Sequence, residues 1–129
     1  MQESDRGLAP TTRPRRLADS QDFRRVREQG RCWSDSRLVL CVYPNGLDNV
    51  RVGYAVSKRI GKAVRRNRVK RLMRESVRAF ADLLVPGWDI VIIARPRVSV
   101  ADYWDLASSV GHLLGQAGVL CSNETPVVG

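Results

Sequence analysis

Basic side chains dominate one stretch of this sequence and set the chemistry that it can perform. Residues 51–80 include eleven lysines and arginines, half of the 22 in the chain, against a single acid, Glu75. The whole chain has 13 acidic residues and a net charge of +9. A protein with this balance commonly binds a polyanion, because its own charges repel one another when no counter-charge is present. Nucleic acid and an anionic membrane surface are the partners that this composition favours.

The spacing of residues 63–84 predicts a long helix with two different faces. At about 100° per residue, apolar side chains gather on one side, which must lie against the rest of the fold. These are Val69, Leu72, Met73, Ser76, Phe80 and Leu83. The opposite side carries Lys70, Arg71, Arg74 and Arg78. Charges on the outer face of a helix are often simply solvated, so these four alone do not establish a binding site.

The first turn of this helix breaks the pattern and gives the stronger signal. Arg65 and Arg66 project toward the apolar side, where two unpaired guanidinium groups are not expected to be buried. The helix N-terminus is therefore predicted to overhang the core, with Lys62, Arg65, Arg66 and Arg68 around its free N–H groups. Gly61 permits close backbone approach just before it. Cations at this end weaken a helix, so we expect phosphates to bind there.

Other functions fit the sequence less well. A helix lying on a membrane presents large apolar side chains to lipid, but here the apolar face is needed to cover a sheet. Residues 1–16 lack the apolar core of a signal peptide, and no segment approaches the roughly 20 apolar residues of a spanning helix. His112 is the only histidine and falls opposite the apolar stripe of its helix, so no histidine-based triad is expected. The acids are scattered, which predicts no metal site and no stand-alone catalyst.

The three cysteines are expected to be reduced thiols in the cytoplasm. Cys32, Cys41 and Cys121 are odd in number, widely spaced and form no CxxC pair, so neither a zinc site nor a disulfide framework is predicted. Cys41 lies in an apolar run and is expected to be a small buried hydrophobic residue.

The elements that position these residues follow from periodicity and turn residues. A length of 129 residues suits one domain, expected at residues 17–117 between a flexible basic arm (1–16) and a flexible tail (118–129). The predicted elements are a helix at 20–29, strands at 37–43, 50–56 and 89–94, and helices at 63–84 and from 103 onward. This order, α-β-β-α-β-α, predicts a layered α/β domain.

Residues 52–74 resemble the signature of a known family, the bacterial ribonuclease P protein subunit. The centre of the match is Arg66-Asn67-Arg68, followed by Lys70, Arg71 and Arg74. The likeness extends over residues 17–114. It implies a ribosomal-protein-like α/β (α+β) two-layer sandwich with a four-stranded sheet, the topology α-β-β-β-α-β-α, and a left-handed βαβ crossover, which is rare in general. The fourth strand would come from residues 31–33 or from a division of the first two predicted strands.

The resemblance also implies a function. Members of the family join a catalytic RNA in a ribonucleoprotein that removes the 5′ leader of precursor tRNA, and the RNA with its bound Mg²⁺ performs the hydrolysis. No membrane or DNA partner is expected. The residues that would bind RNA are Lys58, Arg59, Lys62, Arg65, Arg66, Asn67, Arg68, Lys70, Arg71 and Arg74.

The single-stranded leader would lie in a cleft between the first helix and the sheet, and there the sequence departs from the family pattern. Phe23 keeps the first of two helix aromatics, but Arg27 replaces the second, and Cys41 beside Val39 replaces a strand aromatic. Stacking on an aromatic ring contributes about 1–3 kcal/mol per base, whereas an arginine adds charge and a planar group. We therefore expect leader binding to be more electrostatic here, although Phe23 could equally be a core residue.

Two other functions remain open at this point. A general structured-RNA-binding or ribosome-associated protein would recognise shape and backbone without a leader cleft. A stand-alone nuclease is the least favoured, because the sequence offers it no catalytic residues.

Overall fold

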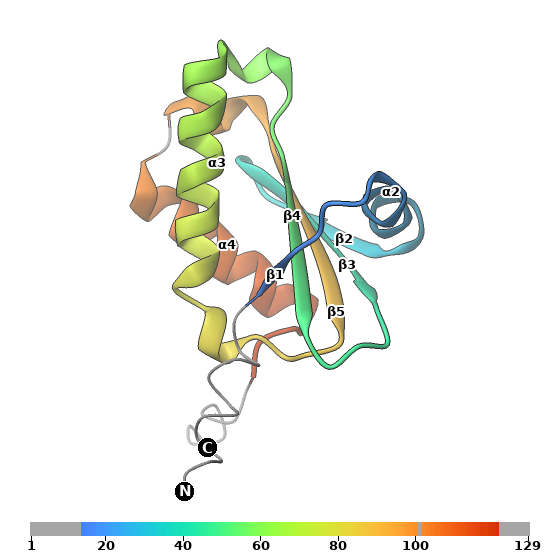
Figure 1. Ribbon diagram of the computed structural model, residues 1–129. Helices are drawn as coiled ribbons and strands as arrows, with labels where there is room; N and C mark the ends of the chain where they lie inside the picture. Colours follow the sequence, from blue (N-terminus) through green and yellow to red (C-terminus); the bar gives the residue numbers. More distant parts are fainter. Residues whose placement is uncertain (1–13, 101, 122–129) are drawn as a thin grey trace, which may run out of the picture.

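The computed structural model describes residues 14–100 and 102–121 of the chain. Three α-helices and one mixed sheet make up this part of the chain (Figure 1). The strands are β1 (Arg15–Arg16), β2 (Arg31–Ser34), β3 (Leu38–Pro44), β4 (Val50–Ala55) and β5 (Trp88–Ala94). The α-helices are α2 (Ser20–Gln29), α3 (Ala63–Arg78) and α4 (Tyr103–Ala117), and the 3-10 helices are η1 (Lys58–Ile60), η2 (Ala81–Leu83) and η3 (Pro96–Val100).

The sheet has five strands in the order β1-β4-β5-β3-β2. β3 pairs antiparallel with both β2 and β5, whereas β4 pairs parallel with β5 and β1. Helix α3 joins the neighbouring parallel strands β4 and β5, so a βαβ unit is present. The prediction of a four-stranded sheet is wrong. The sheet has a fifth strand, because β1 pairs with the outer edge of β4. The remaining order, α2-β2-β3-β4-α3-β5-α4, agrees with the expected topology, and β2 comes from the segment around Cys32.

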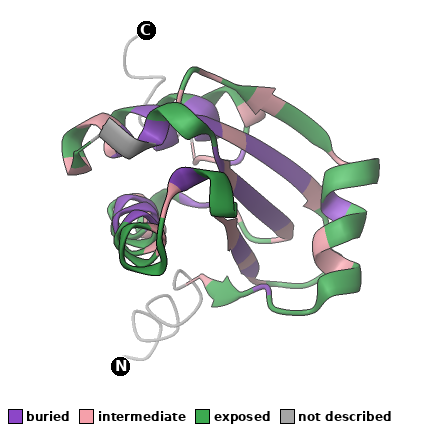
Figure 2. Ribbon diagram, turned by 90° about the horizontal axis from the view of Figure 1, so that it is seen from above, coloured by how far each residue is buried: buried purple, intermediate pink, exposed green. Residues whose placement is uncertain are grey.

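Helices cover both faces of the sheet, so the structure has three layers where two were expected. Side chains of β3 alternate between the faces: Leu38, Leu40 and Val42 join the main core under α3 and α4, while Val39 and Cys41 join a smaller cluster under α2. Figure 1 shows α2 on one side of the sheet and α3 with α4 on the other. Figure 2 shows the central strands buried between these layers. Strands apolar on both faces were predicted for this reason.

Strand β1 forms because the edge of β4 offers free backbone groups. Arg15 lies opposite Arg51 and Arg16 opposite Val52, and the Leu17 N–H then donates to the Val52 carbonyl at 3.0 Å. Leu17 is buried beneath α2 and fixes the chain as it leaves the sheet. The segment expected to be an arm thus contributes β1, and the rest of that arm, residues 1–13, lies outside the described residues.

Helix α3 begins at the predicted Ala63 but ends at Arg78, before the predicted residue 84. The Phe80 ring packs against Gly111 of α4, where an added Cβ would lie only 2.6 Å from the Phe80 Cζ. The chain turns at this contact into η2, which leaves Leu83 exposed rather than in the predicted apolar face. Helix α4 starts with a capping box, in which Asp102 and Asp105 each accept the other's backbone N–H.

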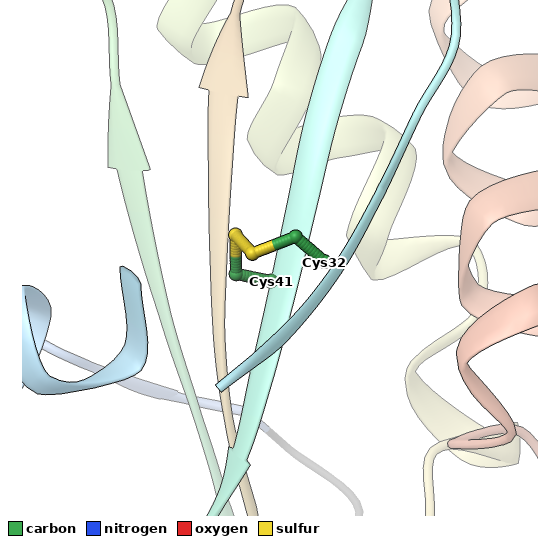
Figure 3. Close-up of a disulfide and its surroundings, with 2 residues drawn as sticks. All are labelled: Cys32 and Cys41. Carbon is green, nitrogen blue, oxygen red and sulfur yellow. A yellow bond between two sulfur atoms is a disulfide. The ribbon is translucent and has the colours of Figure 1, made fainter. Parts of the chain in front are cut away.

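A disulfide between Cys32 and Cys41 corrects the expectation of free thiols for these two residues (Figure 3). The two cysteines lie directly opposite each other in the β2–β3 hairpin, and both face the α2 side of the sheet. Cys121 is free. Across the described ranges, no helix has the length and apolar character needed to cross a membrane.

The turn between β2 and β3 is held by Asp35. Its Oδ1 accepts from the backbone N–H groups of Arg37 and Leu38, both at 2.8 Å. Burial alone would raise the pKa of Asp35, but hydrogen bonds from Ser109 and these two N–H groups outweigh it and lower the pKa below its usual 3.8.

Candidate RNA-binding surface

The junction between η1 and α3 carries the cationic cluster that the sequence predicted. Ser57 caps η1, with its Oγ accepting from the Arg59 N–H at 3.2 Å. Gly61 then adopts φ +143°, a conformation that other residues rarely take. Helix α3 follows with Lys62 at its N-cap position, no side-chain cap and no acid in its first turn. The positive end of α3 is therefore left to lysines and arginines, which is unfavourable unless an anion binds.

A side chain at position 61 would also meet Arg65. An added Cβ would lie 2.9 Å from the Cδ of Arg65, whose side chain folds back over the junction. The stem of Arg65 therefore lies beside Gly61, and close approach of a phosphate at this position stays a prediction. Arg65 as a whole is exposed in the first turn of α3.

Arg66 carries an unusual donor. The residue is half-buried, and its Nε is buried without any hydrogen-bond acceptor among residues 14–100 and 102–121. A buried N–H of a charged group that lacks an acceptor is costly. An acceptor supplied from outside the chain, such as a phosphate oxygen, would remove this cost.

The other predicted RNA-binding residues lie mostly on the surface. Lys70 is half-buried like Arg66, and the exposed members are Lys58, Arg59, Lys62, Arg65, Asn67, Arg68, Arg71 and Arg74. No cation of this set takes part in an ion pair with an acid of the described part of the chain. The structure therefore brings the predicted residues together along one edge formed by η1 and α3, with their charge uncompensated.

The ion pairs serve a structural purpose elsewhere. Arg51 binds Asp89 through two bonds, Nε–Oδ1 at 2.7 Å and Nη2–Oδ2 at 2.6 Å, and its Nη1 lies 3.4 Å from Asp22 of α2. Asp89 is only 3% exposed. The hydrogen bond to Asp89 is the main reason that the pKa of Arg51 is raised. This network ties α2 to the sheet and thereby positions Phe23.

The predicted leader-binding residues are only partly brought together. Phe23, Val39 and Cys41 meet in the smaller apolar cluster, where Cys41 is 2% exposed and its sulfur is bonded to Cys32. Arg27 is exposed and shares with Phe23 a hollow of about 510 Å³ along residues 18–28, which neither Val39 nor Cys41 lines. Cys41 is therefore enclosed rather than open to a ligand.

Sequence reasoning missed aromatic and basic residues near both surfaces. Tyr43 lies two residues after Cys41 on the same face of β3 and is half-buried, with its hydroxyl 3.3 Å from Gln29 Oε1. Strand periodicity could have found it. Tyr54 lies beside Arg74, whose guanidinium carbon is 5.8 Å from the ring centroid. Arg16 was assigned to an arm and has no comparable sequence signal.

These features define the class of protein. One edge carries many uncompensated cations, and no three His, Cys, Asp or Glu side chains of the described residues are grouped as metal ligands. A single α/β domain of this kind is a nucleic-acid-binding protein.

Comparison with known proteins names the family. The model of the family Ribonuclease P matches residues 11–118. The ribonuclease P protein component of Herpetosiphon aurantiacus is 44% identical over 114 residues, which is 88% of this chain and 93% of the relative. That of Caldanaerobacter subterraneus is 43% identical over 99 residues, 77% of this chain and 85% of the relative.

Solved structures agree with the sequence comparison. The ribonuclease P protein of Staphylococcus aureus has a TM-score of 0.76 at 30% identity, covering 81% of this chain and 96% of that one. That of Thermotoga maritima has a TM-score of 0.72 at 32% identity, covering 78% and 96%. The chain belongs to the ribonuclease P protein family. It is a protein subunit of a ribonucleoprotein endoribonuclease that processes tRNA.

Proposed function

We propose that this subunit binds the catalytic RNA of ribonuclease P through the cations of η1 and α3 and holds the 5′ leader of precursor tRNA on the α2 side. The observation that carries the proposal is the buried Nε of Arg66, which lacks an acceptor in the described chain and lies within the uncompensated cluster. Phosphate oxygens of the RNA would accept from Arg66 and from the free N–H groups of α3.

Two exposed arginines of the cluster have a defined task in this proposal. Arg65 and Arg68 are exposed beside the uncapped helix end and would neutralise backbone phosphates. Displaced counterions would make binding strongly salt-dependent. Mg²⁺, bound mainly by the RNA, would supply the activation of water for hydrolysis. The protein would contribute position and charge.

On the α2 side, Phe23 would stack on a leader base while Arg27 contributes charge from the next turn. Both line the hollow along residues 18–28. The cytoplasmic location and the left hand of the β4-α3-β5 crossover remain predictions.

One observation favours a second candidate, a structured-RNA-binding protein without leader recognition. The hollow at Phe23 does not extend to Val39, and Cys41 is enclosed in a disulfide. A surface limited in this way has fewer stacking positions for a single strand.

Binding of precursor and mature tRNA to the reconstituted ribonucleoprotein separates the two candidates. The proposed function predicts tighter binding of the precursor, and the preference should fall when Phe23→Ala or Arg27→Gln is introduced. Arg31→Gln removes an exposed charge on β2 beside Trp33, on the face of the sheet away from α2; it is the control and should leave the preference intact. Equal affinity for the two tRNAs would favour the second candidate.

A further inference from the structure

A second hollow lies at the β4 edge of the sheet, between the cationic surface of α3 and the hollow at α2. We call it the edge groove; its volume is about 1070 Å³, and its walls come from the β1 segment, β4 and α3. Strand β1 accompanies β4 only as far as Val52 and then turns away at Leu17. Figure 1 shows β1 beside β4 at this edge. The groove therefore extends along β4 past the end of β1, where Tyr54 lies.

The walls of the edge groove are strongly cationic. Lys70, Arg74 and Arg78 come from successive turns of α3, and the β1 segment adds Arg15 and Arg16. Residues four apart on a helix rise by about 6 Å, so the three α3 cations form a row along the groove. Asp82 is the one acidic residue of the lining. Five cations around one hollow repel each other, and an extended polyanion is the ligand that relieves this repulsion.

The groove also offers a stacking position. Tyr54 is half-buried, and Arg74 lies over its ring with the guanidinium carbon 5.8 Å from the centroid. Burial raises the pKa of Tyr54 to about 12, although Arg74 and Arg78 pull it down, so the hydroxyl remains a donor at neutral pH. Aromatic rings and arginine planes bind unpaired bases without sequence preference. A single strand therefore fits this lining better than a duplex, whose bases are already stacked.

The edge groove adjoins the hollow along residues 18–28. Phe23 and Ala18 line both of them. Phe23 and Tyr54 lie on opposite faces of the sheet and both line the edge groove, so a strand that contacts Phe23 can continue around the β4 edge to Tyr54. In the proposed function the unpaired strand at Phe23 is the precursor leader.

We propose that the edge groove binds the 5′-distal nucleotides of the precursor tRNA leader, beyond those held at α2. Arg15, Arg16 and Arg78 neutralise their phosphates, and Tyr54 with Arg74 stacks a base. This inference rests on the proposed function and extends it, because it predicts that a longer leader gains affinity from residues outside the α2 side.

The test uses the reconstituted ribonucleoprotein and two precursors, one with a leader long enough to reach the groove and one cut short at the α2 side. The variant is the double substitution Arg15→Gln and Arg16→Gln, at two exposed positions of β1, and the control is Arg31→Gln. We expect the double variant to bind the long-leader precursor about tenfold more weakly at moderate salt, with a shallower salt dependence. Affinity for the short-leader precursor and for the catalytic RNA should not change.

Other outcomes overturn the inference. Equal losses for the two precursors would show that the groove does not hold the distal leader. A loss of affinity for the catalytic RNA would assign the groove to that RNA instead, and no change would leave it a solvated surface. If the wild-type complex binds precursor and mature tRNA equally, the proposed function itself fails. A preference for the precursor that does not depend on leader length in the wild type overturns the inference alone.

Discussion

Replacing Arg66, Arg68 and Lys70 together with glutamine removes three charges from the edge that we assign to catalytic RNA. None of the three forms an ion pair with an acid of the described chain. Among their side-chain nitrogens, the Arg66 Nε is the one that is buried without an acceptor. The substitution therefore takes away charge without breaking an internal contact of this kind. Fewer cations near the uncapped end of α3 should leave the melting temperature unchanged or slightly raised.

The magnitude follows from counterion release. Each phosphate contact contributes about 0.7–0.9 to the slope of log affinity against log salt, so three lost contacts flatten that slope by about 2.1–2.7. Between about 50 and 200 mM salt, the ratio of wild-type to variant affinity should then shrink about 20- to 40-fold.

The assay is filter binding or fluorescence anisotropy with the catalytic RNA across a salt series. Arg31→Gln on β2 serves as the matched control, because it removes one exposed charge at the opposite edge of the sheet. An unchanged slope in the triple variant would show that these side chains face plain solvent and would refute the reasoning.

Three further predictions concern the fold. Gly61→Ala should destabilise the protein by about 1–3 kcal/mol, because alanine is strained at φ +143° and meets a side chain there. Gly115→Ala lies in open space within α4 and should stabilise the protein by about 0.5–1 kcal/mol. Urea unfolding measures both free energies, and equal effects of the two substitutions would contradict the prediction. Asp35→Ala should cost about 1 kcal/mol near pH 7. Because the folded-state pKa is lowered, that difference should fade as the pH falls below the ordinary value of 3.8, and a difference that persists at acid pH would contradict this origin. Reduction of the Cys32–Cys41 disulfide, whose cysteines are nine residues apart, should lower the free energy of unfolding by about 2–3 kcal/mol; thiol titration of the unreduced, unfolded chain should find one free thiol, and three would show that the bond is absent.

Much of the fold could be predicted because local patterns and tertiary contacts agree. Strands β3 and β5 are apolar on both faces, and α3 starts where Gly61 and the change of period place it. The end of α3 could not be predicted in this way. No helix-breaking residue occurs between Arg78 and Leu84, and the helix stops because Phe80 packs onto Gly111 of α4.

Strand β1 and the disulfide share a different reason for being missed. Arg15 and Arg16 have no strand pattern of their own and become a strand only because β4 has a free edge beside them. Cys32 and Cys41 are nine residues apart, and their pairing is evident only once the hairpin register places them opposite each other. Both features depend on partners that are remote from the local sequence pattern.

The sequence predicted the placement of the candidate site's side chains better at α3 than at α2, and their binding roles stay predictions. At α3 the sequence signal was a group of basic residues without neighbouring acids, and in the structure these side chains are exposed around Arg66. At α2 the residues were transferred by family position. Position alone did not indicate that Cys41 is enclosed in a disulfide or that Tyr43 lies beside it.

The most direct test of the central claim is cleavage of precursor tRNA at low Mg²⁺ by the cognate catalytic RNA, with and without the purified protein. We predict that the protein stimulates cleavage at the mature 5′ end, that the Arg66, Arg68 and Lys70 triple variant stimulates it much less, and that the protein alone cleaves nothing. Absence of stimulation at every salt concentration, or RNA-free cleavage that EDTA abolishes, would contradict the account.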